Sequence, residues 1–222
     1  MQRFKNQIVS EGQCSVQRCP KEWRNSFDYT ENIILQNLEF VNCEFIGEGL
    51  ASYGGPVNRS KAENLRLKNC VVNSFFGIGA IFDDVVVDGL RTSRSPVILF
   101  GCALRHVVLS GKCGRFLFNR NVCNDDQQRN STFDSANSEF YKDVDWAMDI
   151  STLNTAGFEI RGSIPSRLIR RNPEVHFIMT RTTALEGGWK HYDWTPLELF
   201  LAGVRGWKAC LQQLIGRLAD EK

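Results

Sequence analysis

The segments NLEFVNCEF (residues 37–45) and NLRLKNC (residues 64–70) repeat one short phrase, in which asparagine precedes an apolar residue. Within each phrase the apolar residues are five apart, Leu38 with Cys43 and Leu65 with Cys70. A period of five matches neither the 3.6-residue period of a helix nor the continued alternation of a flat strand. The positions on this period, with a two-residue slip before the last three, are Ile33, Leu38, Cys43, Leu65, Cys70, Phe75, Ala80, Val85, Leu90, Val97, Cys102 and Val107.

A second row of mostly large apolar residues follows the first by two positions. Alternate residues of an extended backbone share a face, so each unit is expected to place two side chains inward and then turn. The chain is therefore predicted to wind. The second row comprises Leu35, Phe40, Phe45, Leu67, Val72, Gly77, Phe82, Val87, Thr92, Leu99, Leu104 and Leu109.

The stretches NLEFV, NCEFI, KNCVV and DWAMD resemble the pentapeptide-repeat family, whose consensus is a small residue, Asp or Asn, Leu or Phe, and two variable positions. The resemblance covers roughly residues 31–120, with a weaker echo at 131–160 in which Trp146, Ser151 and Ala156 are five apart. It implies a mainly β fold: a right-handed quadrilateral parallel β-helix, a solenoid with about 20 residues per coil. Asp or Asn precedes the inward residue at Asn37, Asn42, Asn64, Asn69 and Asp84, but the later coils lack it.

Coil length predicts which residues stack. Leu65, Val85 and Val107 should form one column, with the excess of the second interval in TSRSP (92–96). Leu38 joins the column if GLASYGGPVNRSK (49–61) carries a seven-residue bulge, and Cys43 then stacks on Cys70. Wider, irregular coils are the alternative for residues 110–145.

Three regions are expected, because an open solenoid needs capped ends. Residues 1–30 are predicted to form an N-terminal cap, 31–160 the pentapeptide-like β-helix, and 161–222 an α/β C-terminal cap. Within the last, SIPSRLIRRNPE (163–174) predicts a short helix and VHFIMTR (175–181) a strand. A capping box at 195–198 begins a final helix, which either covers the last coil or pairs two protomers.

Charge and hydropathy argue against nucleic acid and membranes as partners. The chain has 222 residues and a formal net charge of +2, from 27 basic and 25 acidic side chains, which provides no strong field for nucleic acid or an anionic membrane. Residues 1–13 lack the apolar stretch of a secretory signal, and no run of about 18 apolar residues appears that could cross a bilayer. A cytoplasmic protein without membrane contact is predicted.

Cysteines are expected to be free thiols that fill the core, because the chain is long and shows no export signal. Cys14 and Cys19 have the C-x4-C spacing of a possible zinc-binding pair. No second pair follows at a matching spacing, so a zinc site is not predicted. No metal or cofactor is predicted. The eight cysteines are Cys14, Cys19, Cys43, Cys70, Cys102, Cys113, Cys123 and Cys210.

The candidates for catalysis are few. His106, His176 and His191 are far apart and no nucleophile motif accompanies them. Asp83, Asp84 and Asp88 could perform polysaccharide chemistry on a wider β-helix, with Asp84 alternatively a turn residue. The chain is therefore predicted not to be an enzyme, with a carbohydrate-active enzyme as the alternative.

Binding candidates lie toward the C-terminus. The densest basic cluster could bind phosphate or an acidic protein, and its three residues from 167 to 171 would lie close to one face of a helix. The segment EGGWKHYDW (186–194) resembles an adaptable interface loop. The candidate residues are Arg161, Arg167, Arg170, Arg171, Trp189, Tyr192 and Trp194.

A non-catalytic solenoid that presents a rigid surface to a protein partner is the favoured function. Some members of the resembled family mimic DNA as strongly acidic dimers. Here basic residues outnumber acidic ones in 31–120, which disfavours DNA mimicry. Nucleic-acid binding through Arg167–Arg171 is a further alternative, and predicts affinity that falls steeply with salt.

Overall fold

The computed structural model describes residues 2–5, 8–10, 13–14, 34–46, 48–52, 55–93, 95–123, 125–174 and 176. The chain divides into two compact units, Met1–Arg171 and Asn172–Lys222, and every element below belongs to the first. The strand predicted at 175–181, the capping box, the final helix, Trp189, Tyr192 and Trp194 lie outside the described residues.

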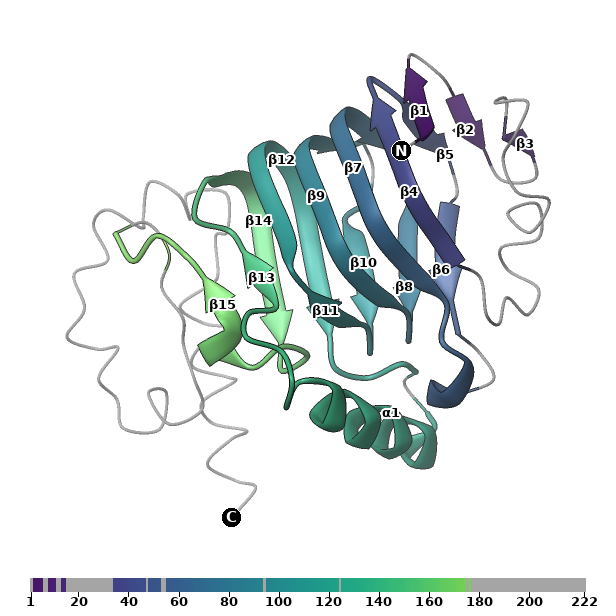
Figure 1. Cartoon of the computed structure of the whole chain (residues 1–222), viewed down its shortest axis with the longest axis vertical. Helices are drawn as coiled ribbons and strands as arrows, with labels where there is room; N and C mark the ends of the chain where they lie inside the picture. The colour runs from purple at the N-terminus through teal and green to yellow at the C-terminus, as the bar shows by residue number, and fades with distance from the viewer. Residues whose placement is uncertain are drawn as a thin grey trace. The chain divides into compact units, whose positions relative to one another are not determined.

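The first unit is mainly β, with a curled parallel sheet and one α-helix among the described residues (Figure 1). Every described pairing is parallel except that of β2 with β3. The helical elements are the 3-10 turns η2 (Pro56–Asn58) and η3 (Ser166–Leu168) and the helix α1 (Gln127–Phe140). The strands are β1 (Gln2–Lys5), β2 (Ile8–Ser10), β3 (Gln13–Cys14), β4 (Ile34–Val41), β5 (Glu44–Ile46), β6 (Glu48–Ala51), β7 (Lys61–Val72), β8 (Phe75–Ile78), β9 (Ile81–Thr92), β10 (Val97–Phe100), β11 (Ala103–Arg105), β12 (Val107–Asn119), β13 (Met148–Asp149), β14 (Leu153–Arg161) and β15 (Ile169–Arg170).

Two parallel ladders build the sheet and meet in the long strand β12. One runs β4, β7, β9, β12, and the other runs β6, β8, β10, β12 and then β14. At the N-terminal side, β1 pairs with β4 and β2 with β5, so part of the predicted cap, residues 1–30, continues the ladder. Core residues from both ladders belong to one hydrophobic cluster.

The predicted column of stacked residues is confirmed by the strand register. Leu38 pairs with Leu65, and Leu65 with Val85. The pairing of Val86 with Val108 continues the column from Val85 to Val107.

The other stacking predictions hold as well. The backbone N–H of Val71 donates to the carbonyl of Cys43, so Cys43 lies over Cys70 as predicted. The longer interval before β7 is taken up by an excursion that contains η2, preceded by Gly55 at a φ of 115°.

Both apolar rows face the core. Every described member of the two rows lies in the hydrophobic cluster or packs against it, apart from Gly77 and Thr92. Between the inward residues Leu67 and Cys70, Lys68 and Asn69 are both exposed. Two consecutive outward residues break the strand alternation, and this is how a period of five curls the sheet.

A residue with positive φ stands before most first-row residues. The predicted turn residues take φ values of 51° to 58°: Asn37, Asn42, Asn64, Asn69 and Asp84. At four other first-row positions the same place is held by Gly79, Gly89, Gly101 and His106, with φ values of 53° to 72°. Left-handed backbone is open to glycine and tolerated by Asn and Asp, so the turn conformation is kept while the residue type changes.

Helix α1 is a feature that the five-residue pattern did not predict. The Asp126 side chain caps it by accepting from the N–H of Arg129. Its buried residues are Asn130, Phe133 and Asn137, and Phe140 packs partly buried against the core, so few apolar side chains mark its inner face. Such a polar helix lacks the apolar stripe by which helices are recognised in sequence. Residues 110–145 do not form the irregular coils given as an alternative. Strand β12 runs to Asn119, and α1 follows it.

The helix predicted at 163–174 is wrong. Residues 166–168 form the single turn η3, and Ile169 then extends into β15, which pairs with Met148 in β13. In the echo region Met148 and Leu153 are buried, whereas Ser151 is exposed, so the first row does not continue there.

Candidate functional site

Carboxylates predicted as catalytic candidates take part in contacts between neighbouring strands. The carboxylate of Asp83 in β9 accepts hydrogen bonds from both Nε and Nη2 of Arg105 in β11, with 2.8 Å between Nε and Oδ1. Asp84 pairs with Arg66 of β7 at 3.3 Å. The Oδ1 of Asp88 lies 3.5 Å from the hydroxyl of Ser110 in β12. These contacts tie adjacent strands together.

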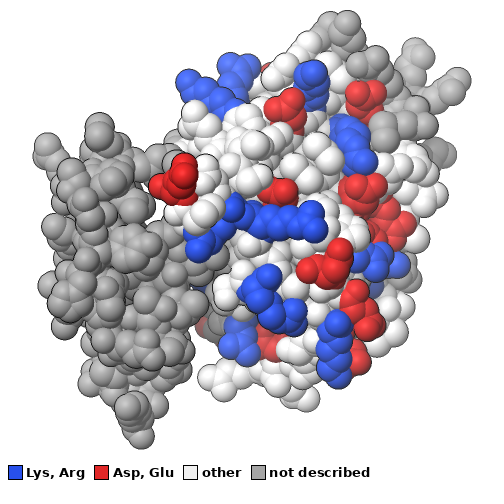
Figure 2. Space-filling model, turned by 60° about the vertical axis from the view of Figure 1, so that its left-hand side comes forward, with Lys and Arg blue, Asp and Glu red and all other residues white. Residues whose placement is uncertain are grey.

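The outer face of β4, β7, β9 and β12 carries both charge signs around an apolar centre. The half-buried side chains of Val86 and Val108 are register partners, and Glu39 and Arg66 continue their row. Figure 2 shows basic and acidic side chains interspersed over the face in view, with white surface between them. We call the surface of β4, β7, β9 and β12 around the register partners Val86 and Val108 the outer face.

His106 contacts Asp145 and Trp146. Its Nε2 lies 2.7 Å from the Oδ1 of Asp145, and its ring lies 4.7 Å from that of Trp146. The hydrogen bond with His106 holds the pKa of Asp145 below its ordinary value. His176 hydrogen-bonds through its backbone to Asn172, and His191 lies outside the described residues.

The predicted arginine cluster is divided among different contacts. Arg161 pairs with Glu159 at 2.6 Å, and Arg170 lies 4.3 Å above the ring of Trp146. Arg167 is exposed and lines a cavity. The expected single helical face does not form, because 166–168 is a 3-10 turn and 169–170 a strand.

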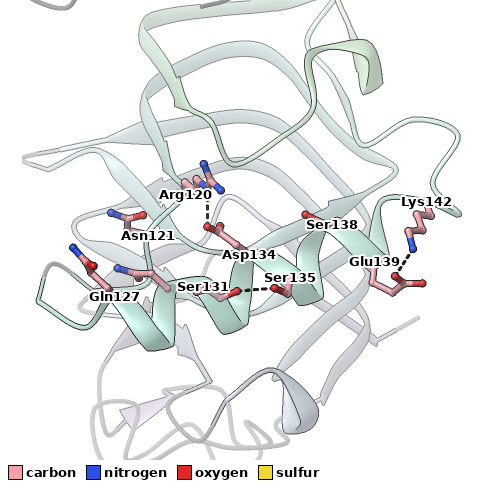
Figure 3. Close-up of a pocket in the computed structure, with 10 residues that line it drawn as sticks. Arg120, Asn121, Gln127, Ser131, Asp134, Ser135, Ser138, Glu139 and Lys142 are labelled. Atoms are coloured by element: carbon pink, nitrogen blue, oxygen red, sulfur yellow. Dashed lines mark hydrogen bonds and ion pairs between the residues drawn. The ribbon is translucent and has the colours of Figure 1, made fainter. Parts of the chain in front are cut away.

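Two cavities lie beside α1. The helix groove, of about 630 Å³, is lined by polar and charged side chains of α1 together with Arg120, Asn121 and Lys142 (Figure 3). Within it Arg120 Nε lies 2.8 Å from Asp134 Oδ2, and Lys142 pairs with Glu139. The groove is thus a surface of largely compensated charge.

The turn cavity, of about 330 Å³, lies between the C-terminal half of α1 and residues 162–167. Arg120 and Asp134 line this cavity too. Its wall includes Ser163, whose hydroxyl is buried without a hydrogen-bond partner. Sequence reasoning identified Arg167 but not Ser163, because an unsatisfied hydroxyl is visible only in three dimensions.

Arg59 fastens α1 to the sheet. Its guanidinium donates to the carbonyls of Gly79, Ala80 and Gly101, and Nη1 lies 2.7 Å from Asn137 Oδ1. The side chain is 6% exposed, and burial lowers the pKa of Arg59 from its ordinary value. This buried cation is held by neutral oxygen atoms: three backbone carbonyls and the amide oxygen of Asn137.

Cys43, Cys70, Cys102, Cys113 and Cys123 are free thiols, and all of them except Cys123 are buried. Burial raises the pKa of Cys70 to about 11 and that of Cys102 to about 12. They are protonated at neutral pH and serve as small core residues. Cys19 lies outside the described residues, and the described part of the chain contains no group of three or more His, Cys, Asp or Glu arranged for a metal ion.

No family model, curated protein or solved structure matches the chain. The likeness to the pentapeptide-repeat family therefore stays a prediction. Among the described residues, no helix has both the length and the apolar character to span a bilayer.

Proposed function

We propose that the chain is a right-handed quadrilateral β-helix of the pentapeptide-repeat type, and that it acts as a non-catalytic scaffold presenting its outer face to a protein partner. The fold part of the proposal is supported by the stacked column and by the positive-φ residues at regular intervals. Solenoids of this kind offer extended rigid surfaces, which limits the ordering cost of binding.

The mixed outer face is the observation that carries the functional part. Protein interfaces commonly combine an apolar centre with a polar rim, and Val86 with Val108 provides such a centre. The charges around it carry both signs, so a partner with a complementary pattern gains specificity. Arg66 and Arg105 are already paired with Asp84 and Asp83, and this leaves little net positive charge for a nucleic-acid backbone.

The test compares three immobilised baits in native lysate: the natural chain, Val86→Lys and Thr132→Lys. Both variants add one positive charge, but Thr132 is an exposed residue of α1 away from the outer face. We expect a stoichiometric protein partner to be captured by the natural chain and by Thr132→Lys, and its recovery to fall about tenfold with Val86→Lys. Circular dichroism confirms that each bait is folded. Equal recovery on all three baits, or no stoichiometric protein on any, contradicts the proposal.

A further inference from the structure

The second ladder carries apolar side chains on its outward face as well as in the core. Alternate residues of a strand point to opposite sides of a sheet, so the residues between the inward ones of β8, β10 and β12 face outward. Figure 1 shows β8 beside β10, and the strand register aligns the outward residues in two rows. We call their apolar members the apolar face: Phe76, Ile98 and Leu117 in the Ile98 row, and Ile78 and Phe100 in the Phe100 row.

The apolar face is not part of the protein interior. None of its five residues belongs to the hydrophobic cluster or packs against it, and each is half-buried. The first ladder places charged residues at outward positions, as with the register partners Glu39 and Arg66. By contrast, neither row of the apolar face contains a charged residue from β8 to β12. Large apolar side chains gathered on an outward face mark an interaction surface.

Charge appears where the two rows reach β14. The Ile98 row passes from Leu117 to Glu159, and the Phe100 row passes through Asn119 to Arg161. Both charged side chains are exposed, and the Nε of Arg161 lies 2.6 Å from the Oε1 of Glu159. The two rows therefore end on opposite charges at one edge of the apolar face.

We propose that two copies of the chain associate through the apolar face, about a two-fold axis that runs along the ladder between the two rows. Such an axis turns each row onto the other row of the second copy, so Ile98 of one copy faces Phe100 of the other. It also brings Glu159 of each copy opposite Arg161 of the other, so the charges of the rim are complementary to themselves. An apolar centre without charge is typical of interfaces between identical chains. The proposal concerns a different surface from the outer face and does not depend on it.

The size of the apolar face sets the expected affinity. The four strands from β8 to β14 span ~14 Å and four residues of each span ~13 Å, which gives an area of roughly 200 Å². Stable complexes bury ~800 Å² on each partner, so the turns that flank the face contribute the rest of the contact. We expect a dissociation constant of about 10–100 µM.

The experiment is sedimentation velocity on the whole protein, at concentrations from about 1 to about 300 µM that bracket this dissociation constant. The variant Ile98→Lys places a charge at the centre of the apolar face. The matched control is Ile34→Lys, the same change at an isoleucine of β4 that is 54% exposed and belongs to the first ladder. We expect the control to dimerise like the natural chain and Ile98→Lys to dimerise about tenfold more weakly or worse, because an unpaired charge is costly to bury.

Charge reversal tests the two-fold arrangement. Glu159→Arg brings two arginines together across the interface and should weaken the dimer severalfold, and adding Arg161→Glu should restore it. Circular dichroism confirms that each variant is folded. A monomer at every concentration overturns the proposal. So does a dimer that Ile98→Lys weakens no more than Ile34→Lys, or one that the second charge reversal fails to restore.

Discussion

Replacing Arg59 with methionine tests how α1 is held. The change leaves two acceptors without a described donor, the carbonyl of Gly79 and the Oδ1 of Asn137. The carbonyls of Ala80 and Gly101 keep other donors, the N–H of Ala103 and the Nδ2 of Asn137. Each buried acceptor left unsatisfied costs ~1–3 kcal/mol. Arg59→Met should therefore lower the free energy of unfolding by ~2–6 kcal/mol, less any desolvation cost that the buried guanidinium no longer incurs.

Urea unfolding followed by circular dichroism measures this loss, with the m-value expected to stay constant. The control is Arg91→Met, because Arg91 is exposed and its replacement should change the free energy of unfolding by less than ~0.5 kcal/mol. In a double-mutant cycle, Arg59→Met combined with Asn137→Leu should cost less than the sum of the single changes, since the two side chains share a hydrogen bond. A loss below ~1 kcal/mol for Arg59→Met, or one equal to that of the control, would refute the assigned role.

Three further predictions concern turns and core. Asn69→Val places a β-branched residue at a φ of 52° and should lower the free energy of unfolding by at least ~1–2 kcal/mol, whereas Asn69→Gly should lower it less. Equal losses for the two variants in urea unfolding would contradict the left-handed turn. Gly79→Ala places a Cβ at a φ of 63° and against the Phe133 ring, so the melting temperature of the variant should fall by several degrees. An unchanged melting temperature would contradict the packing of α1 against Gly79. Burial raises the pKa of Cys70 from 9.0 to about 11, so its contribution to stability is complete below pH 9 and is lost as the pH rises toward 11. Cys70→Ala should lose less unfolding free energy than the natural protein across that interval, and parallel alkaline profiles would oppose this reading.

Periodicity predicted the parts of the fold that inward side chains determine. Leu65 and Val85 stack as predicted because strand register follows the buried rows, and a slipped register would expose the core. The asparagines before the inward residues marked the turns, but Gly79 and His106 serve the same purpose and were not recognised. Positive φ is the shared requirement, and several residue types meet it.

The helix and the cavities could not be read from the pattern. Helix α1 is anchored by Asn137 and Asn130 and by one buried ring, Phe133, so it has no apolar period. Its docking depends on Arg59, which is distant in sequence and whose partners are backbone carbonyls. Such contacts belong to no side-chain motif, and only coordinates reveal them.

The most direct test of the central claim, that successive turns of the chain stack in parallel and in the stated register, is a methyl NOE measurement on selectively labelled protein. Leu65 and Val85 are register partners, and Val107 follows Val85 in the next strand. We predict cross-peaks between Leu65 and Val85 and between Val85 and Val107, and none between Leu65 and Val107, whose backbones lie two strand spacings apart at ~9.6 Å. Resolved methyl signals without the two neighbour cross-peaks would contradict the stacked register.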